Sequence, residues 1–201
     1  MADSTNCLFL IPARVGSTRI PGKNFRVLAG VSPVERAAMC AMPLAQGLAS
    51  IVVTTDNFDW TIDRCLGRSS GRLTGIKALY RVSALASETA LMIDVVKDAV
   101  SRWPGGDPVV LLQPTQPLRK PETVRKAINL LTPDMDSVVT IGLDRFVRDG
   151  TAYVFWRLTV ERYGTIYGEK VVLMPVPANE TCPLDTPEDW IEAERRLQHE
   201  H

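Results

Sequence analysis

The sequence predicts a three-layer α/β/α fold, in which helices cover both faces of a mainly parallel central sheet. Short apolar runs rich in β-branched residues alternate along the chain with segments of helical periodicity. Several of these runs are apolar at every position, which is typical of strands that are buried on both faces. Strands are expected at Leu8–Ala13, Ser50–Asp56, Lys77–Arg81, Pro108–Thr115, Ser137–Gly142, Thr151–Trp156 and Lys170–Val176.

The helices between these strands are indicated by start signals and by apolar periodicity. Ser32–Glu35 offers a capping hydroxyl, a proline at the first helical position and a returning carboxylate, which together form a capping box. Thr186–Asp189 repeats this pattern, with Asp in place of Glu, before a helix that includes Trp190–Leu197. Apolar stripes at helical spacing predict two further helices, at Ser87–Trp103 and Pro121–Leu131.

Length and composition are those of an ordinary globular domain. The 201 residues suit one domain with a substantial core, and 23 basic residues balance 23 acidic ones, so nucleic acid and anionic membranes are not expected partners. No stretch is long enough to span a bilayer, and the apolar start is too short for a signal peptide, so a cytoplasmic location is expected. The four cysteines are widely separated, which predicts buried, reduced thiols rather than a metal site or disulfides.

The stretch IPARVGSTRIPGKN, residues 11–24, directly follows the first expected strand. A glycine-containing loop in this position can turn its backbone N–H groups toward an anion, and Arg14, Arg19 and Lys23 add positive charge. Ligands of open α/β sheets gather at the carboxyl ends of the strands. A phosphate site is therefore favoured over the alternative, a surface loop with solvated charges.

Two common phosphate motifs are excluded by their spacing. Gly16 and Gly22 enclose five residues, and Asn24 rather than Ser or Thr follows Lys23, so the loop is not a Walker A motif. The sequence also contains no G-x-G-x-x-G. Neither a P-loop NTPase nor a dinucleotide-binding protein is supported.

Three further stretches stand where such a site would need them: YRVSALASETALMIDVV (80–96), LLQPTQPLR (111–119) and LDTPEDW (184–190). Together with the loop at 11–24, and in this order, they resemble the CMP-N-acylneuraminate synthetases, the cytidylyltransferases that activate sialic acids. The resemblance runs from about Leu8 to Leu197. It implies a single nucleotidyltransferase domain over residues 1–201 that transfers CMP from CTP to the anomeric hydroxyl of a sialic-acid-like 2-keto sugar acid, with Mg²⁺ as cofactor and pyrophosphate as the second product.

The same resemblance implies roles for individual residues. Arg14, Ser17, Lys23 and Asn24 match the motif that contacts the triphosphate, and Lys23 is the candidate for stabilising charge as pyrophosphate leaves. Other matches are Arg81 and Ser87 to positions that contact the cytosine, Gln113 and Thr115 to a motif beside nucleotide and sugar, Tyr153 to a sugar-side tyrosine, and Asp185 to a metal-binding aspartate. Arg14, Lys23 and Asp185 are thus the expected catalytic residues.

Each of the residues outside the first motif also has a purely structural explanation, which the sequence leaves open. Arg81 could be an exposed charge at a strand end, Ser87 a helix N-cap, Gln113 a hydrogen-bonding loop residue, Thr115 a turn hydroxyl, Tyr153 a core residue, and Asp185 a charge paired with a helix N-terminus.

The chain departs from the family pattern at the metal. Family members usually carry D-x-D where this chain has Pro183-Leu184-Asp185, and proline cannot bind a metal. One matched carboxylate remains, so the ion must depend more on phosphate oxygens and water. Weak binding of Mg²⁺ to the nucleotide-free protein is therefore predicted. In addition, Gln116 replaces a usual Ser, and Thr18 replaces a usual Lys for which Arg19 could compensate.

A second departure lies between about residues 141 and 151. Relatives usually insert a projecting segment there that mediates dimerisation and brings basic residues to the sugar carboxylate, whereas here Ile141 is followed almost directly by Thr151. Arg145 or Arg148 could bind the carboxylate instead. A homodimer, if formed, would need a non-standard interface.

Two alternative functions stay open. The loss at Pro183 and the missing segment would suit a catalytically impaired nucleotide-binding homologue. A nucleotidyltransferase for another sugar acid, such as the eight-carbon Kdo, is the other alternative, although the Gly-Lys-Asn and ALASETA stretches favour the sialate branch.

Overall fold

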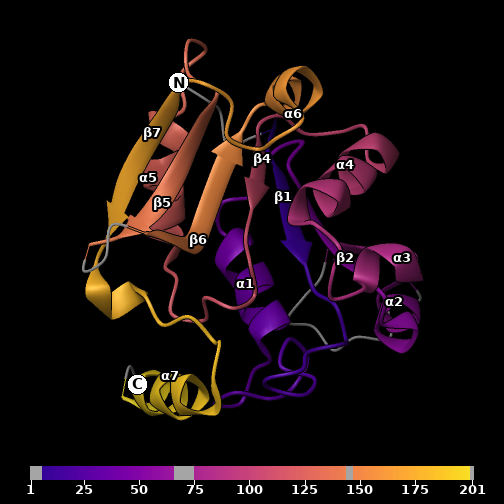
Figure 1. Cartoon of the computed structure of the whole chain (residues 1–201), viewed down its shortest axis with the longest axis vertical. Coiled ribbons are helices and arrows are strands. Elements are labelled where there is room, and N and C mark those ends of the chain that lie inside the picture. The colour runs from indigo at the N-terminus through magenta and orange to yellow at the C-terminus, as the bar shows by residue number, and fades with distance from the viewer. Residues whose placement is uncertain (1–5, 66–74, 144–146, 200–201) are drawn as a thin grey trace.

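The computed structural model describes residues 6–65, 75–143 and 147–199. Within these ranges seven strands form a single sheet with the order β3-β2-β1-β4-β6-β5-β7 (Figure 1). All seven strands expected from the sequence are present: β1 (Leu8–Pro12), β2 (Ser50–Thr55), β3 (Ile76–Tyr80), β4 (Val109–Leu111), β5 (Ser137–Gly142), β6 (Arg148–Phe155) and β7 (Val171–Val176). The prediction of the strands is confirmed, with β6 beginning three residues earlier than expected.

The sheet is mainly parallel, as predicted. Only β6 runs against its neighbours, pairing antiparallel with β4 on one side and with β5 on the other. From the central strand β1 the chain first builds outward through β2 to β3 and then returns to place β4 on the opposite side of β1. This change of direction creates a topological switch point between β1 and β4, where ligands of open α/β sheets bind at the carboxyl ends of the strands.

Alternating residues of the strands feed two separate cores, one on each face of the sheet. Phe9 and Ile11 of β1 belong to the core that contains the buried faces of α1 (Pro33–Ala41) and α5 (Pro121–Leu130). Leu8 and Leu10 belong to the core that contains α4 (Met92–Arg102) and α6 (Arg157–Tyr163). The period of two along β1 therefore produces the three predicted layers.

The last helix, α7 (Pro187–Gln198), lies beyond the carboxyl end of β1, beside the loop that follows this strand (Figure 1). Its buried residues Trp190, Ala193 and Leu197 form a third core with Ile20 and Leu28 of that loop. The predicted capping box is present, because the Thr186 hydroxyl accepts from the Asp189 N–H at 3.2 Å and Asp189 Oδ2 accepts from the Thr186 N–H at 2.8 Å. α7 therefore covers the loop that carries the first motif.

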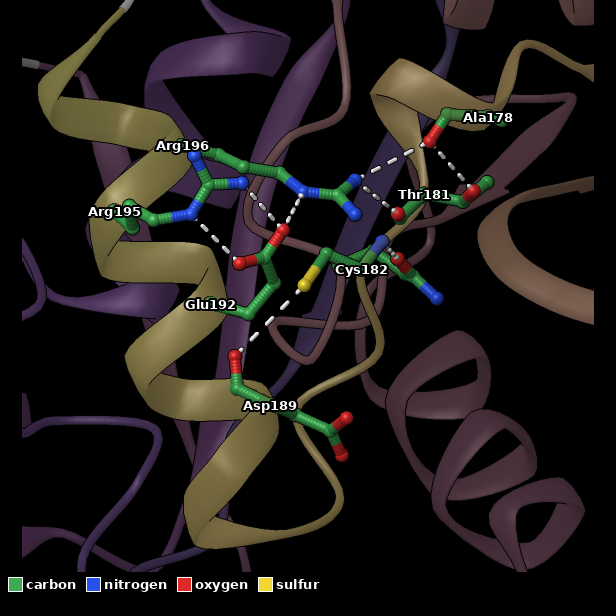
Figure 2. A network of polar contacts seen from close by, with 8 residues as sticks. Ala178, Thr181, Cys182, Asp189, Glu192, Arg195 and Arg196 are labelled. Carbon is green, nitrogen blue, oxygen red and sulfur yellow. Dashed lines mark hydrogen bonds and ion pairs between the residues drawn. The ribbon is translucent and has the colours of Figure 1, made fainter.

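Polar contacts fix the other side of α7 to the chain that precedes it (Figure 2). The Glu192 carboxylate bridges the guanidinium groups of Arg195 and Arg196, at 2.8 and 2.7 Å. Arg196 also donates to the backbone oxygens of Thr181, at 3.2 Å, and of Ala178, at 3.4 Å, in the short helix η3 (Ala178–Glu180). The segment between η3 and α7 is thereby held at both ends.

Two helical predictions need correction. The helix expected at Ser87–Trp103 begins only at Met92, because a separate short helix, α3 (Ser83–Ala86), ends at Ser87 as its C-cap. Leu91, inside the expected helix, therefore precedes α4 and is 63% exposed instead of lying on its buried face. The structure also contains α2 (Phe58–Cys65) and α6, which the sequence analysis did not predict.

Three of the four cysteines, Cys7, Cys40 and Cys182, are buried free thiols, in agreement with the prediction. Burial raises the pKa of the Cys40 thiol to about 12. The side chain of Cys65 lies outside the described part. Among the helices described, none combines the length and the apolar character needed to cross a bilayer.

Candidate active site

A cavity of about 310 Å³ opens at the switch point between β1 and β4. Four segments line it: the loop after β1, the residue after β3, the α3–α4 region and the loop after β4. The lining includes all eight residues expected to contact the nucleotide, namely Arg14, Ser17, Lys23, Asn24, Arg81, Ser87, Gln113 and Thr115. Residues separated by about one hundred positions in sequence thus share one cavity.

The loop after β1 is shaped by its own backbone and by one buried side chain. Gly22 adopts a φ of 66°, which a residue with a side chain rarely does, and the N–H groups of Phe25 and Arg26 both bond back to its carbonyl at 2.9 Å. The buried Asn24 donates from Nδ2 to the Arg14 carbonyl at 2.9 Å. Asn24 therefore braces the loop as well as lining the cavity, and the loop is not simply a solvated one.

Positive charge converges at this loop. The Lys23 ammonium lies 3.9 Å from Asp185 Oδ1, and the more exposed Arg19 lies 3.8 Å from the same atom. Burial is the main cause that lowers the pKa of Lys23, and the charges of Arg19 and Arg14 lower it further, while Asp185 opposes them. An anion entering the cavity would relieve this repulsion, which is the electrostatic character of a phosphate site.

The backbone of Leu184 connects two of the segments that line the cavity, the loop after β1 and the loop after β4. Its N–H donates to the Thr115 carbonyl at 2.9 Å, and its own carbonyl accepts from Lys23 Nζ. Its side chain is fully buried in the core beneath α7. Because both contacts use main-chain atoms, no residue type in the sequence pointed to this position.

Arg81 is not an exposed charge at a strand end; that alternative is wrong. It is 3% exposed and donates from Nη2 to the Thr54 carbonyl at 2.7 Å. Burial lowers its pKa to about 10, against the opposing effect of Asp56. Ser87 lies on the exposed rim, where its hydroxyl donates to the Ala84 carbonyl at 3.1 Å, and it does not cap α4.

The structure does not bring Tyr153 to this cavity. It is 7% exposed, it belongs to the core on the α4 face, and its ring meets that of Tyr167 edge-on at 6.3 Å between centroids. Burial raises its pKa to about 12. Of the two arginines suggested for the sugar carboxylate, Arg145 lies outside the described residues, and the Arg148 guanidinium carbon lies 4.6 Å from the Tyr167 ring centroid.

The carboxylates near the cavity fit a metal ion only in part. In the described ranges, no three histidine, cysteine or acidic side chains gather closely enough to hold an ion. Asp189 already accepts from the N–H groups of Asp185 and Thr186, as part of the helix cap. Asp185, with a half-exposed carboxylate, is the hard oxygen donor beside Lys23 and Arg19, and Glu88 also lines the cavity. This donor set suits Mg²⁺ only when phosphate oxygens and water complete the coordination.

The fold and this cavity define a class: an α/β protein with a cationic, phosphate-type pocket at the switch point of a mostly parallel sheet. The model of the family described as Cytidylyltransferase matches residues 8–148. The chain belongs to this cytidylyltransferase family.

Curated relatives match about two thirds of the chain. The CMP-N,N'-diacetyllegionaminic acid synthase of Legionella pneumophila is 34% identical over 146 residues, which cover 67% of this chain and 57% of that protein. The N-acylneuraminate cytidylyltransferase of Streptococcus agalactiae serotype III is 32% identical over 135 residues, covering 66% of this chain and 31% of that protein. The chain thus spans about half, or less, of the length of these relatives.

A solved structure shows the same fold over almost the whole chain. The CMP:2-keto-3-deoxy-manno-octonic acid synthetase complexed with CTP superposes with a TM-score of 0.75 at 16% identity, covering 98% of this chain and 100% of that one. The three-layer arrangement is accordingly the nucleotidyltransferase fold, as the sequence predicted.

Proposed function

We propose that this protein transfers CMP from CTP to the anomeric hydroxyl of a sialic-acid-like 2-keto sugar acid. The observation that carries the proposal is the shared cavity, in which Arg14, Lys23, Arg81 and Gln113 come together from three separate segments. The names of the two curated relatives, an N-acylneuraminate cytidylyltransferase and a CMP-N,N'-diacetyllegionaminic acid synthase, support this choice of substrate.

In the proposed complex the loop after β1 binds the triphosphate. Arg14, Ser17, Lys23 and Asn24 line that side of the cavity. Burial is the main cause that lowers the pKa of Lys23, and the neighbouring Arg19 and Arg14 lower it further, so a bound anion would stabilise its ammonium form. Arg81, Ser87, Gln113 and Thr115 also line the cavity. We assign Arg81 and Ser87 to the cytosine, and Gln113 and Thr115 to the region beside the nucleotide and the acceptor. The buried anchor of Arg81 on Thr54 keeps the guanidinium orientation fixed before the ligand arrives.

The chemical step is an in-line displacement. The acceptor oxygen forms a bond to the α-phosphorus, the bond from that phosphorus to the bridging oxygen breaks, pyrophosphate leaves, and the hydroxyl proton passes to water. Such a reaction needs positioning and charge neutralisation rather than a covalent nucleophile from the protein. Lys23 and Arg14 neutralise the charge that develops on pyrophosphate.

A divalent ion, with Mg²⁺ as our choice, would be held by Asp185 together with phosphate oxygens and water. When bound it would supply charge neutralisation at the phosphates. Asp185 lies near Lys23 and Arg19, so protein carboxylate and cations meet on the same side of the cavity. This arrangement supports an ion that arrives with the nucleotide rather than one that resides in the protein.

We further propose that residues 1–201 act as one cytidylyltransferase domain without the projecting dimerisation segment. Residues 143–147 alone connect β5 to β6, and the Gly142 N–H donates to the Val147 carbonyl at 2.9 Å across the connection. A homodimer would then use another surface, and sedimentation equilibrium would show whether a dimer forms. Tyr153 as a sugar-side residue receives no support from its buried position.

The test is pyrophosphate release from CTP with N-acetylneuraminate, a diacetylated nonulosonate and Kdo as acceptors, each with and without Mg²⁺. Release with either nine-carbon acid is the expected result, and release with Kdo alone would shift the substrate to the eight-carbon class. A thermal-shift series with CTP, UTP, GTP and ATP identifies the base, because only the bound nucleotide raises Tm.

A second function, nucleotide binding without catalysis, has one observation in its favour. Asp185 is the carboxylate that lies 3.9 Å from Lys23 and 3.8 Å from Arg19, and Pro183 stands where relatives carry a second aspartate. CTP binding by calorimetry with no pyrophosphate release at any Mg²⁺ concentration would establish this function. Turnover that is lost in Lys23→Ala would exclude it.

A further inference from the structure

The hydrogen-bonded pairing of β4 with β6 covers only part of β6, and side-chain contacts connect the remaining part of β6 to the loop after β4. The last paired residues are Leu111 of β4 and Tyr153 of β6, while β6 itself extends back to Arg148. Gly150 and Thr151 therefore belong to the part of β6 that precedes its pairing with β4. Buried carbonyls in such a position need another donor.

Arg119 supplies that donor. It is 7% exposed, and it donates from Nε to the Thr151 carbonyl at 2.7 Å and from Nη2 to the Gly150 carbonyl at 3.3 Å. The same Nη2 donates to the Gln113 carbonyl at 2.5 Å. One guanidinium thus fixes the spacing between the start of β6 and the residue of the β4 loop that lines the cavity.

At this spacing the Gln113 side chain lies directly over Gly150. A Cβ placed on Gly150 would lie 2.5 Å from Gln113 Oε1, which is closer than any non-bonded contact permits. Gly150 also adopts a φ of +78°, in the left-handed region. The absence of a side chain at this position is therefore a requirement for the present orientation of the Gln113 amide.

We propose that Gly150 is a positioning residue: because it has no side chain, the Gln113 amide can adopt the orientation in which it contacts the bound nucleotide. Arg119 fixes the distance between Gly150 and Gln113. This inference rests on the proposed function, because it takes Gln113 as a nucleotide contact. It assigns to the start of β6, immediately after the short β5–β6 connection, a direct part in shaping the site. Gly150 itself touches no substrate and acts only through Gln113.

The test is a double-mutant cycle on CTP affinity, measured by calorimetry in the presence of Mg²⁺. Gly150→Ala and Gln113→Ala are each expected to weaken CTP binding about tenfold, because each removes or displaces one polar contact. The combined variant is expected to bind no more weakly than Gln113→Ala alone. A residue with a merely structural role would instead give additive losses, about one hundredfold in the combined variant.

Gly168→Ala is the matched control. Gly168 also has a positive φ, +71°, and an added Cβ would meet the side chain of Asp136. It lies near the amino ends of the parallel strands β5 and β7, whereas the cavity lies at the carboxyl ends of the parallel strands. This variant should lose thermal stability in the same manner as Gly150→Ala and keep the parent CTP affinity within about twofold.

The outcomes separate the inference from the proposed function. A parent chain that binds no CTP overturns the proposed function and the inference with it. A parent chain that binds CTP, with Gly150→Ala binding equally well or with fully additive losses, overturns the inference alone. If Gly150→Ala does not fold, Gly150→Asn carries the same Cβ but tolerates a positive φ, and it is expected to show the same cycle.

Discussion

The two walls of the cavity are built on opposite physical principles. The wall after β1 presents cations to the cavity, with the Arg19 side chain 70% and the Lys23 side chain 16% exposed. The wall after β4 also carries an arginine, Arg119, but its guanidinium is buried and directed at backbone carbonyls. An arginine thus lies exposed at the cavity on one wall, and on the other an arginine is buried and connects backbone segments.

This difference teaches that charge alone does not identify a binding residue in such a site. The exposed Arg19 gains little from its ion pair with Asp185, because exposed pairs contribute at most about 1 kcal/mol. The buried Arg119 has its hydrogen bonds satisfied by protein atoms. Substitution of a cavity cation on the first wall should therefore change catalysis, whereas substitution of Arg119 on the second wall should change stability first.

The largest effect is expected for Lys23→Ala, on the catalytic wall. Removing a group that stabilises developing charge lowers kcat by roughly 10²- to 10³-fold, which steady-state pyrophosphate release would measure. Arg19→Ala, on the same wall but far more exposed, is the matched control and should lose less. A kcat for Lys23→Ala within tenfold of the parent would contradict the proposed role.

Arg119→Leu tests the structural wall. It leaves the carbonyls of Gly150 and Thr151 without their Arg119 donor, and the Gln113 carbonyl keeps only the Gln116 N–H. We expect the free energy of unfolding to fall by about 2–4 kcal/mol. Urea denaturation measures this loss. Arg119→Lys keeps the charge but not the several N–H donors of the guanidinium, so it should recover only part of the lost stability. A loss below about 0.5 kcal/mol would show that the buried guanidinium is dispensable.

Asp185→Asn addresses the carboxylate that lies between the walls. Because one protein ligand of Mg²⁺ loses its charge, we expect the Mg²⁺ concentration for half-maximal turnover to rise about tenfold. Titration of the nucleotide-free parent protein should show only weak binding of the ion. Tight binding to that form would contradict the shared coordination by protein and nucleotide.

The smallest effect concerns pH. The pKa of Lys23 lies below its ordinary value of 10.5, chiefly through burial, so its ammonium loses its proton earlier than an exposed lysine as the pH rises. The protonated form binds the triphosphate, so CTP affinity should fall on the alkaline side by several-fold. Lys23→Arg remains charged in that range and should lack this decline. Identical pH profiles for the two proteins would exclude Lys23 as the cause.

The strands could be predicted because their apolar runs are continuous, and the first wall because its residue types announce an anion site. The direction of β6 could not be predicted, since parallel and antiparallel strands buried on both faces share one pattern. The start of α4 was misplaced because Ser87 resembles an N-cap, whereas the structure uses it to end α3. α2 and α6, of eight and seven residues, are too short for a clear periodic signal.

The parts of the site that escaped prediction depend on backbone atoms and on distant partners. Arg119 contacts Thr151 across 32 positions of sequence, and Leu184 contacts Lys23 across 161. No local pattern records such pairs. Tyr153 shows the opposite case, because its match to a family motif suggested a ligand contact and the structure buries it among apolar side chains.

The dual contact of Leu184 has a consequence for biosynthesis. The peptide units on either side of this residue join Thr115 to Lys23, and α7 follows them directly. A nascent chain can therefore pair its early strands before the Leu184 backbone contacts Thr115 and Lys23. The proposed CTP-binding pocket is therefore completed late in translation, after residue 184 has emerged from the ribosome.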